Sequence, residues 1–150
     1  MMNERMKLAN AYHDKKFNCA QSVLLAFGDK TGLDDKTARA IAGGMGGGVG
    51  GCKEEICGAL SGAVLALGML LPHVEEDDQA AKERIYGTVS EFRRRFTERF
   101  GYCRCGDLLN NEASEADRKW ADEIGAERVC PVFIMETVRM LEDYLQELGL

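Results

Sequence analysis

A long uncharged segment near the middle of the chain limits the fold more than any other feature. The segment from Ile56 to Leu71 contains no charged residue, and its small residues Gly58, Gly62 and Ala66 recur every four positions. Residues with this spacing share one face of a helix. The 16 residues are too few for a membrane span, which takes roughly 20. We therefore predict a buried central helix that packs closely through its small residues.

The rest of the chain also has helical periodicity. Helices are expected over residues 5–16, after Asn18 as far as Gly28 or Gly32, over 34–42, 55–71, 79–100 and 131–148, and in a short stretch around Trp120 and Ile124. Segment 101–117 is expected to be loop with about one helical turn. No alternating strand pattern and no internal repeat occurs. The sequence thus predicts an all-α fold, a single-domain helical bundle over residues 1–150 whose central helix follows a glycine-rich loop.

Composition excludes several classes of protein. A net charge of −6 with both signs scattered along the chain argues against a nucleic-acid partner. Apolar residues make up 45 % of the chain, enough for a core that needs no disulfide staples. Residues 1–16 are charged and helical in pattern and do not resemble a signal peptide. We expect a cytoplasmic location and no membrane partner.

The six cysteines carry the chemistry, and they are Cys19, Cys52, Cys57, Cys103, Cys105 and Cys130. In the cytoplasm, cysteines stay reduced unless they bind metal or turn over catalytically. Cys57 falls in the first turn of the central helix, where free backbone N–H groups and the helix dipole lower a thiol pKa below about 8.5. We therefore expect Cys57 to have one of the lowest thiol pKa values in the protein. Cys19 and Cys130 also lie at expected helix starts.

A glycine run, 43-GGMGGGVGG-51, precedes the central helix. It contains a formal G-x-G-x-x-G pattern, but that pattern indicates nucleotide binding only between a strand and a helix, and the preceding segment is helical. Glycines instead allow positive φ and close approach, which leaves N–H groups free to face an anion. We expect Gly48, Gly50 and Gly51 to contribute to a cofactor- or thiolate-binding loop.

Two further cysteines lie beside these elements. Cys52 comes directly before the central helix, and Cys103 forms a C-x-C pair with Cys105. This spacing is too tight for an easy disulfide but presents two thiolates to a metal well. Cys52 and Cys103 are therefore expected near the same pocket, as cofactor-binding residues.

Four motifs occur in a fixed order, namely 18-NCAQSVL-24, the glycine run leading into 57-CGALSGAVLALG-68, 105-CGDLL-109 and Cys130 before the last helix. In this order they resemble the C_GCAxxG_C_C family, whose members are described as redox-active. The resemblance implies that Cys19, Cys57, Cys105 and Cys130 are the catalytic thiols and the metal ligands. A similar domain in split-Soret-type cytochromes is associated with an iron–sulfur centre. Haem is not implied, because no C-x-x-C-H motif is present.

Three functions are consistent with the sequence. The first is a redox protein whose cysteines transfer electrons as a dithiol/disulfide pair or as iron–sulfur ligands. The second is a structural or storage protein with a four-cysteine zinc site, and the third is a non-catalytic helical interaction module. The cofactor thus stays open between an iron–sulfur cluster and zinc. A redox partner protein and a homo-oligomer are both compatible with the first function, and no general base is evident.

Overall fold

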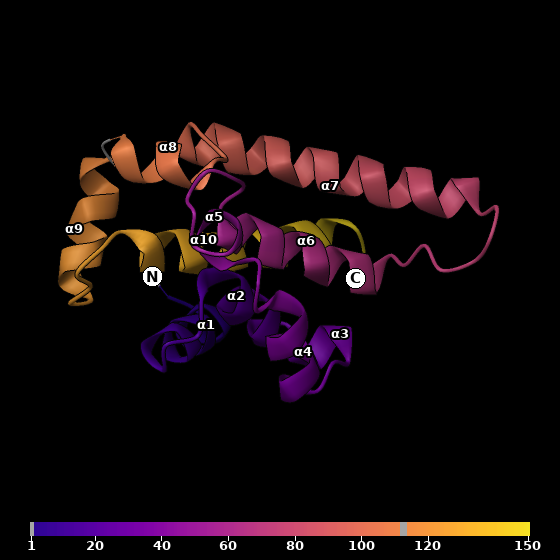
Figure 1. Cartoon of the computed structure of the whole chain (residues 1–150), viewed down its shortest axis with the longest axis horizontal. Helices are drawn as coiled ribbons and strands as arrows, with labels where there is room; N and C mark the ends of the chain where they lie inside the picture. The colour runs from indigo at the N-terminus through magenta and orange to yellow at the C-terminus, as the bar shows by residue number, and fades with distance from the viewer. Residues whose placement is uncertain (1, 112–113) are drawn as a thin grey trace.

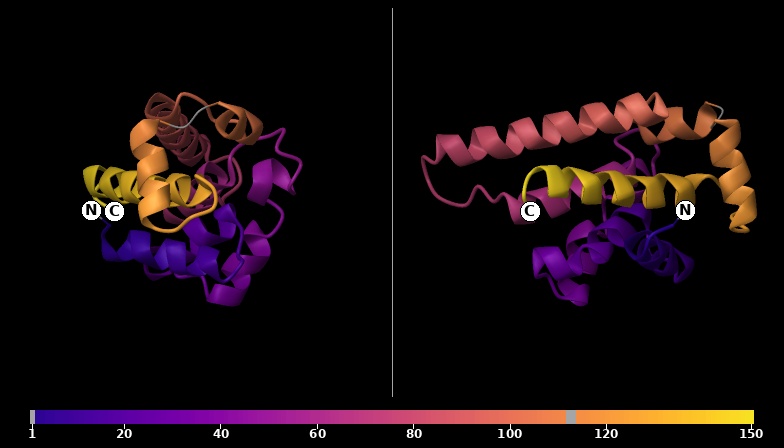
Figure 2. Two further views of the ribbon diagram at one scale, coloured as in Figure 1. Left: turned by 90° about the vertical axis from the view of Figure 1, so that its left-hand side faces the viewer. Right: turned by 180° about the vertical axis from the view of Figure 1, so that it is seen from behind.

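The helices stack in layers in the structure, a computed structural model that describes residues 2–111 and 114–150 (Figure 1). The layers consist of α7 (Gln79–Phe100) on one side, α6 (Gly58–Leu70) and α10 (Cys130–Glu147) in the middle, and α1 (Glu4–Asp14), α2 (Cys19–Ala26), α3 (Gly28–Thr31) and α4 (Asp35–Ala42) on the other side. At one end lie α8 (Cys105–Asn110) and α9 (Glu115–Glu123), and α5 (Gly46–Val49) packs against α2, α6 and α8. Figure 2 shows α10 running between α7 and the N-terminal helices.

The predicted all-α class is confirmed, and the helices form one compact domain. Residues 2–111 and 114–150 contain no β-strand, and their one β-type contact is an isolated antiparallel bridge between Ile56 and Arg104. The bounds of α7 coincide with the predicted ones. Within the described residues, no helix has the length and apolar character needed to cross a bilayer.

Capping side chains fix several helix starts. The Asn18 side chain accepts a hydrogen bond from the Gln21 backbone N–H, and the Gln21 side chain accepts one from the Asn18 N–H, which completes a capping box at α2. Asp34 caps α4 by accepting from the Thr37 N–H at 2.8 Å. Helices after Asn18 and over 34–42 were predicted. The sequence did not predict α3, which ends at Gly32 with a left-handed φ of 71°.

The central helix α6 is buried, as predicted, but begins at Gly58 and not at Glu55. Residues before it are held by the bridge to Arg104 and by a hydrogen bond from the Cys57 N–H to the Cys103 carbonyl, so they cannot continue the helix. The small face packs on α2: a Cβ on Gly62 would lie 2.6 Å from the Ala20 carbonyl oxygen. Glycine at this position therefore allows the two helix backbones to touch.

Opposite α2, helix α7 packs on the core through two aromatic side chains. Phe92 and Phe96 are fully buried. Ile85 and Val89 on the same helix are only half-buried, because the N-terminal part of α7 extends beyond its neighbours (Figure 1).

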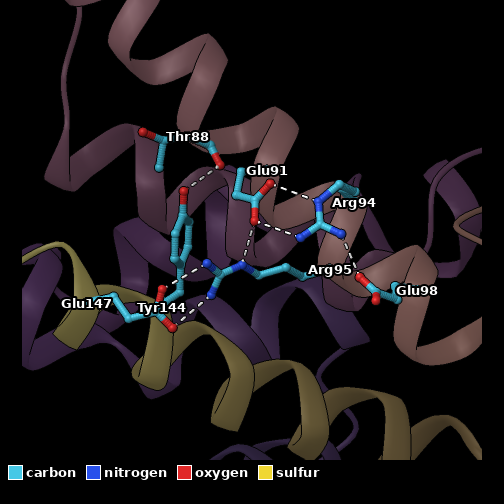
Figure 3. Close-up of polar contacts among 7 residues, drawn as sticks. All are labelled: Thr88, Glu91, Arg94, Arg95, Glu98, Tyr144 and Glu147. Carbon is cyan, nitrogen blue, oxygen red and sulfur yellow. Dashed lines mark hydrogen bonds and ion pairs between the residues drawn. The ribbon is translucent and has the colours of Figure 1, made fainter.

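The outer edge of α7 is tied to α10 by polar groups (Figure 3). Arg95 forms a bidentate ion pair with Glu147 at 2.8 and 3.0 Å, and its guanidinium lies over the Tyr144 ring, 4.3 Å from the centroid. The Tyr144 hydroxyl donates to the Thr88 carbonyl at 3.4 Å. Contacts of this kind fix the orientation of the long helix more than they contribute to stability.

Candidate functional site

Four cysteines line one cavity of about 100 Å³. They are Cys19, Cys57, Cys105 and Cys130, the four residues that the sequence predicts as the site. Each stands at the start of a different helix: three are first helical residues, and Cys57 is the N-cap. The remaining wall consists of Gly47, Lys53, Gly58, Ala59, Leu108, Leu109, Arg128 and Phe133. Residues more than a hundred positions apart in the sequence thus face one small space.

Cys19 comes directly after the capping box of α2 and is half-buried. A Cβ on Gly58 would overlap the Cys19 sulfur, so the sulfur rests against the residue that follows Cys57. Only glycine at position 58 leaves room for this contact. The motif beginning at Cys57 therefore has a structural meaning: its first two glycines, Gly58 and Gly62, bring α2 and the start of α6 together.

Cys57 is buried, with 6 % of its surface exposed. Burial first, and then the charge of Cys19, raise the pKa of its thiol to about 12. The backbone N–H groups of Ala59 and Leu60 act in the opposite direction, although the side chain makes no cap hydrogen bond. The prediction that Cys57 has one of the lowest thiol pKa values is wrong, because the loss of water outweighs the helix N-terminus.

Cys105 is held beside the loop that precedes α6. Its N–H donates to the Glu55 carbonyl at 2.8 Å, and the Gly106 N–H donates to the Lys53 carbonyl at 2.7 Å. Burial and the charge of Cys19 raise its pKa, and Lys53 acts to lower it. Cys105 is thus fixed to this loop by backbone contacts as well as by the packing of its side chain.

Cys130 begins α10 and is followed by Pro131, as the sequence predicts for a helix start. Burial first, and then the charges of Cys19 and Cys105, raise the pKa of its thiol, whereas Arg128 acts to lower it. The charge of Cys19 therefore opposes ionisation of all three other cavity cysteines. Cys19 is the thiol to which the others are electrostatically linked.

The glycine run joins two of these helix starts. A Cβ on Gly46 would overlap the Asn18 side chain at the start of α2, and one on Gly48 would lie 2.5 Å from the Cys105 β-carbon at the start of α8. Gly48 also has a left-handed φ of 63°. Gly50 and Gly51 have positive φ as well, but they are exposed and do not line the cavity. Their role in binding a cofactor stays a prediction.

Cys52 and Cys103 lie outside the cavity lining. Cys52 is exposed in the turn after the glycine run. The Cys103 backbone contacts Cys57, but its sulfur faces the other way and accepts a hydrogen bond from Arg93 of α7 at 3.7 Å. Helix α8 begins at Cys105, so Cys103 belongs to the segment before the helix and the C-x-C pair is divided between two elements.

Two cations of the cavity wall, Lys53 and Arg128, were not predicted. Each is close in sequence to a cysteine at a helix start, since Lys53 precedes Cys57 by four residues and Arg128 precedes Cys130 by two. This proximity is a usable signal, because a cation near a thiol favours its thiolate form.

All six cysteines are free thiols. A single zinc ion needs sulfurs about 2.3 Å from the metal, and the described residues contain no group of three His, Cys, Asp or Glu placed to hold one ion. The role of Cys19, Cys57, Cys105 and Cys130 as metal ligands stays a prediction. A polynuclear cluster is larger than one ion, and four thiols around a cavity match the donor set of an iron–sulfur centre.

One known family matches the chain. The family described as "Putative redox-active protein (C_GCAxxG_C_C)" matches residues 17–144, which include all six cysteines. No curated protein and no solved structure matches the chain.

Proposed function

This chain belongs to the C_GCAxxG_C_C family, and we propose that it is a redox protein in which the four cavity cysteines exchange electrons through reversible disulfide formation. One observation carries the proposal: four cysteines from four helix starts line one small cavity. A core that uses cysteine only as a small apolar residue has no need to gather four at one place. Convergence of thiols is what disulfide exchange requires.

Cys19 and Cys57 are the pair that we assign to the disulfide. The Cys19 sulfur contacts Gly58, the neighbour of Cys57, and Cys19 exerts the largest charge effect of any residue on Cys57. When the bond forms, the two thiols lose two protons and two electrons, and the sulfurs join. The electrons pass to the disulfide of a partner protein, whose S–S bond breaks to give two thiols.

The raised thiol pKa values at this site affect the rate of the reaction. Only the thiolate attacks a disulfide, so the protonated Cys57 attacks slowly. Lys53 and Arg128 favour the thiolate forms of Cys105 and Cys130, respectively. These cations support ionisation of the two half-buried thiols, Cys105 and Cys130, whereas the buried Cys57 thiol stays protonated.

A redox titration tests the proposal. Protein purified without oxygen is equilibrated in dithiol/disulfide buffers, and its disulfides are mapped by mass spectrometry. We expect a two-electron transition that yields a Cys19–Cys57 bond and is lost in Cys57→Ser. Cys103→Ser is the matched control and is expected to behave like the wild type. Four cavity thiols that stay reduced across the whole range would leave the inert helical module as the better assignment.

An iron–sulfur protein is the second candidate, favoured by the four thiols around a cavity of about 100 Å³. Cys19, Cys57, Cys105 and Cys130 would hold the cluster, which would supply electron transfer without disulfide chemistry. In either case the apolar wall formed by Leu108, Leu109 and Phe133 limits the access of water. Metal analysis and visible absorption of the same anaerobic sample distinguish the two candidates, because a dithiol site is colourless.

A further inference from the structure

Cys52 lies on the surface, but the contacts of its thiol group are specific. The thiol donates to the Gly48 carbonyl at 3.1 Å, and the Glu54 N–H donates to the sulfur at 3.5 Å. These two contacts fix the position of the sulfur, and its exposure leaves it open to a reagent. Cys52 therefore differs from the cavity cysteines in being accessible to a large molecule.

Gly48 connects this surface thiol to the cavity. It is buried, and a Cβ on it would lie 2.5 Å from the Cys105 β-carbon and 2.8 Å from the Lys53 α-carbon. The Cys52 sulfur and the Cys105 β-carbon thus approach the same glycine. The charge of Cys52 is also among the influences that raise the pKa of Cys105, after those of burial and Cys19.

The residues on either side of Cys52 have left-handed backbone conformations. Gly50 and Gly51 next to Cys52 are exposed and have φ of 65° and 83°. Lys53 has a left-handed φ of 65°, a conformation that costs a non-glycine residue about 1–3 kcal/mol and is often found at functional sites. The Lys53 carbonyl remains bound to the Gly106 N–H. The segment before Cys52 is thus made of exposed glycines, while the residue after it is held to the start of α8.

We propose that Cys52 is the outer thiol of the site, which attacks the disulfide of a partner protein and passes the oxidation to Cys105. The proposal rests on the disulfide form of the proposed function. In the first step the Cys52 thiolate bonds to one partner sulfur, and the other partner sulfur leaves as a thiolate. The Cys105 thiolate then attacks the Cys52 sulfur, which forms a Cys52–Cys105 disulfide and releases the partner as its second thiol.

Two internal exchanges complete the transfer. Cys19 attacks Cys105 and releases Cys52 as a thiolate, and Cys57 then attacks Cys19 and releases Cys105. Each exchange breaks one S–S bond and forms one, so no further oxidant is needed. The order follows the neighbouring groups in the structure: Cys52 and Cys105 meet at Gly48, and Cys19 contacts the residue beside Cys57.

The test uses the reduced full-length protein and glutathione disulfide as the probe. Samples are quenched in acid at successive times, alkylated and mapped by mass spectrometry. We expect the first mixed disulfide on Cys52, followed by the Cys52–Cys105 bond. In Cys105→Ser the mixed disulfide on Cys52 should accumulate. In Cys52→Ser the oxidation of the cavity thiols should slow on the order of tenfold, because the accessible attacking thiol is gone.

Cys103→Ser is the matched control, since Cys103 has the same chemistry but faces α7, and its rate should equal that of the wild type. A first mixed disulfide on Cys19 or Cys105, or an unchanged rate in Cys52→Ser, overturns the role of Cys52 and leaves the proposed function intact. A Cys52–Cys105 bond without any Cys19–Cys57 bond supports the outer thiol and contradicts the proposed function.

Discussion

The contacts of α6 with α2 and of α7 with α10 hold the same bundle together by opposite means. Between α2 and α6 the backbones approach so closely that a Cβ on Gly62 would lie 2.6 Å from the Ala20 carbonyl oxygen. Between α7 and α10, by contrast, long side chains form the contact at the surface, as in the Arg95–Glu147 pair (Figure 3). A backbone contact has no side chain that can move aside, whereas an ion pair in water can be replaced by water at little cost.

The difference shows which part of the molecule is fixed in detail. The glycine contacts place Cys19 beside Cys57 and set the start of α8 against the glycine run. The charged contacts orient α7, which carries none of the cavity cysteines. We therefore expect small additions of volume near the cavity to have larger effects than the loss of whole charged groups on α7.

Gly62→Ala should give the largest change in stability. Its Cβ would meet the Ala20 carbonyl oxygen, so the helices must separate, at a cost of about 2–3 kcal/mol in the free energy of unfolding. Gly68→Ala on the same helix is the matched control, because a Cβ there meets nothing within 4 Å. The control should stabilise the protein by up to about 1 kcal/mol through helix propensity. Urea unfolding measures both, and equal effects would contradict the comparison.

Gly48→Ala should have the next largest effect, and it should also act on the site. A side chain at positive φ costs about 1–2 kcal/mol, and at this position it would also displace Cys105. Gly51→Ala shares the positive φ but has open space around it, so only the conformational cost applies. Alkylation of Cys105, followed by mass spectrometry, should change in the first variant and not in the second. A change of equal size in both would show that conformation alone matters.

Ionisation of Cys57 should make stability depend on pH. The folded-state pKa of about 12 lies above the ordinary thiol value, which is about 8.5. The stability contributed by the protonated thiol is therefore fully present below about pH 8.5 and is lost as pH rises toward 12, by about 1.4 kcal/mol per pH unit. Urea unfolding of reduced protein between pH 8 and pH 10 measures this slope, and Cys57→Ala should reduce it. An equal slope in the variant would assign the effect to other groups.

Arg94→Gln should have the smallest effect. Arg94 pairs with Glu91 and Glu98 along one exposed face of α7 (Figure 3). Solvent and salt screen such pairs, so the urea midpoint should equal that of the wild type within experimental scatter. A shift as large as that of Gly62→Ala would mean that the charged face contributes as much as the backbone contact, contrary to the comparison.

Periodicity and capping predicted most of the helices, because these signals are local. Asn18 and Gln21 indicate a helix start without reference to any other part of the chain. The apolar period of residues 79–100 likewise predicted the bounds of α7. The start of α6 was missed, since it depends on the bridge between Ile56 and Arg104, which are far apart in sequence. Residues 112 and 113, at the centre of the predicted loop 101–117, lie outside the described residues.

The four cysteines named from the sequence line one cavity, but the pKa expected for Cys57 was wrong. The position of Cys57 at a helix start is visible in the sequence, whereas its burial depends on the helices that surround it. The same limit applies to Cys52 and Cys103, because nothing local shows that Cys52 stays exposed or that Cys103 faces Arg93. The sequence shows that a helix start acts on the pKa of a cysteine, but only the fold shows that burial removes water from its thiol.

The chain positions of the four cavity cysteines also affect how the protein folds. Cys130 begins the last helix, and α10 packs on α1, α2 and α6. Closing a loop between Cys19 and Cys130 costs entropy that local helix contacts do not repay. The cavity therefore cannot exist during synthesis until its last wall has been made, and until then Cys19, Cys57 and Cys105 lack the cover of α10. Under oxidising conditions, a nascent chain at this stage can form incorrect disulfides among these cysteines. The complete fold covers them with α10.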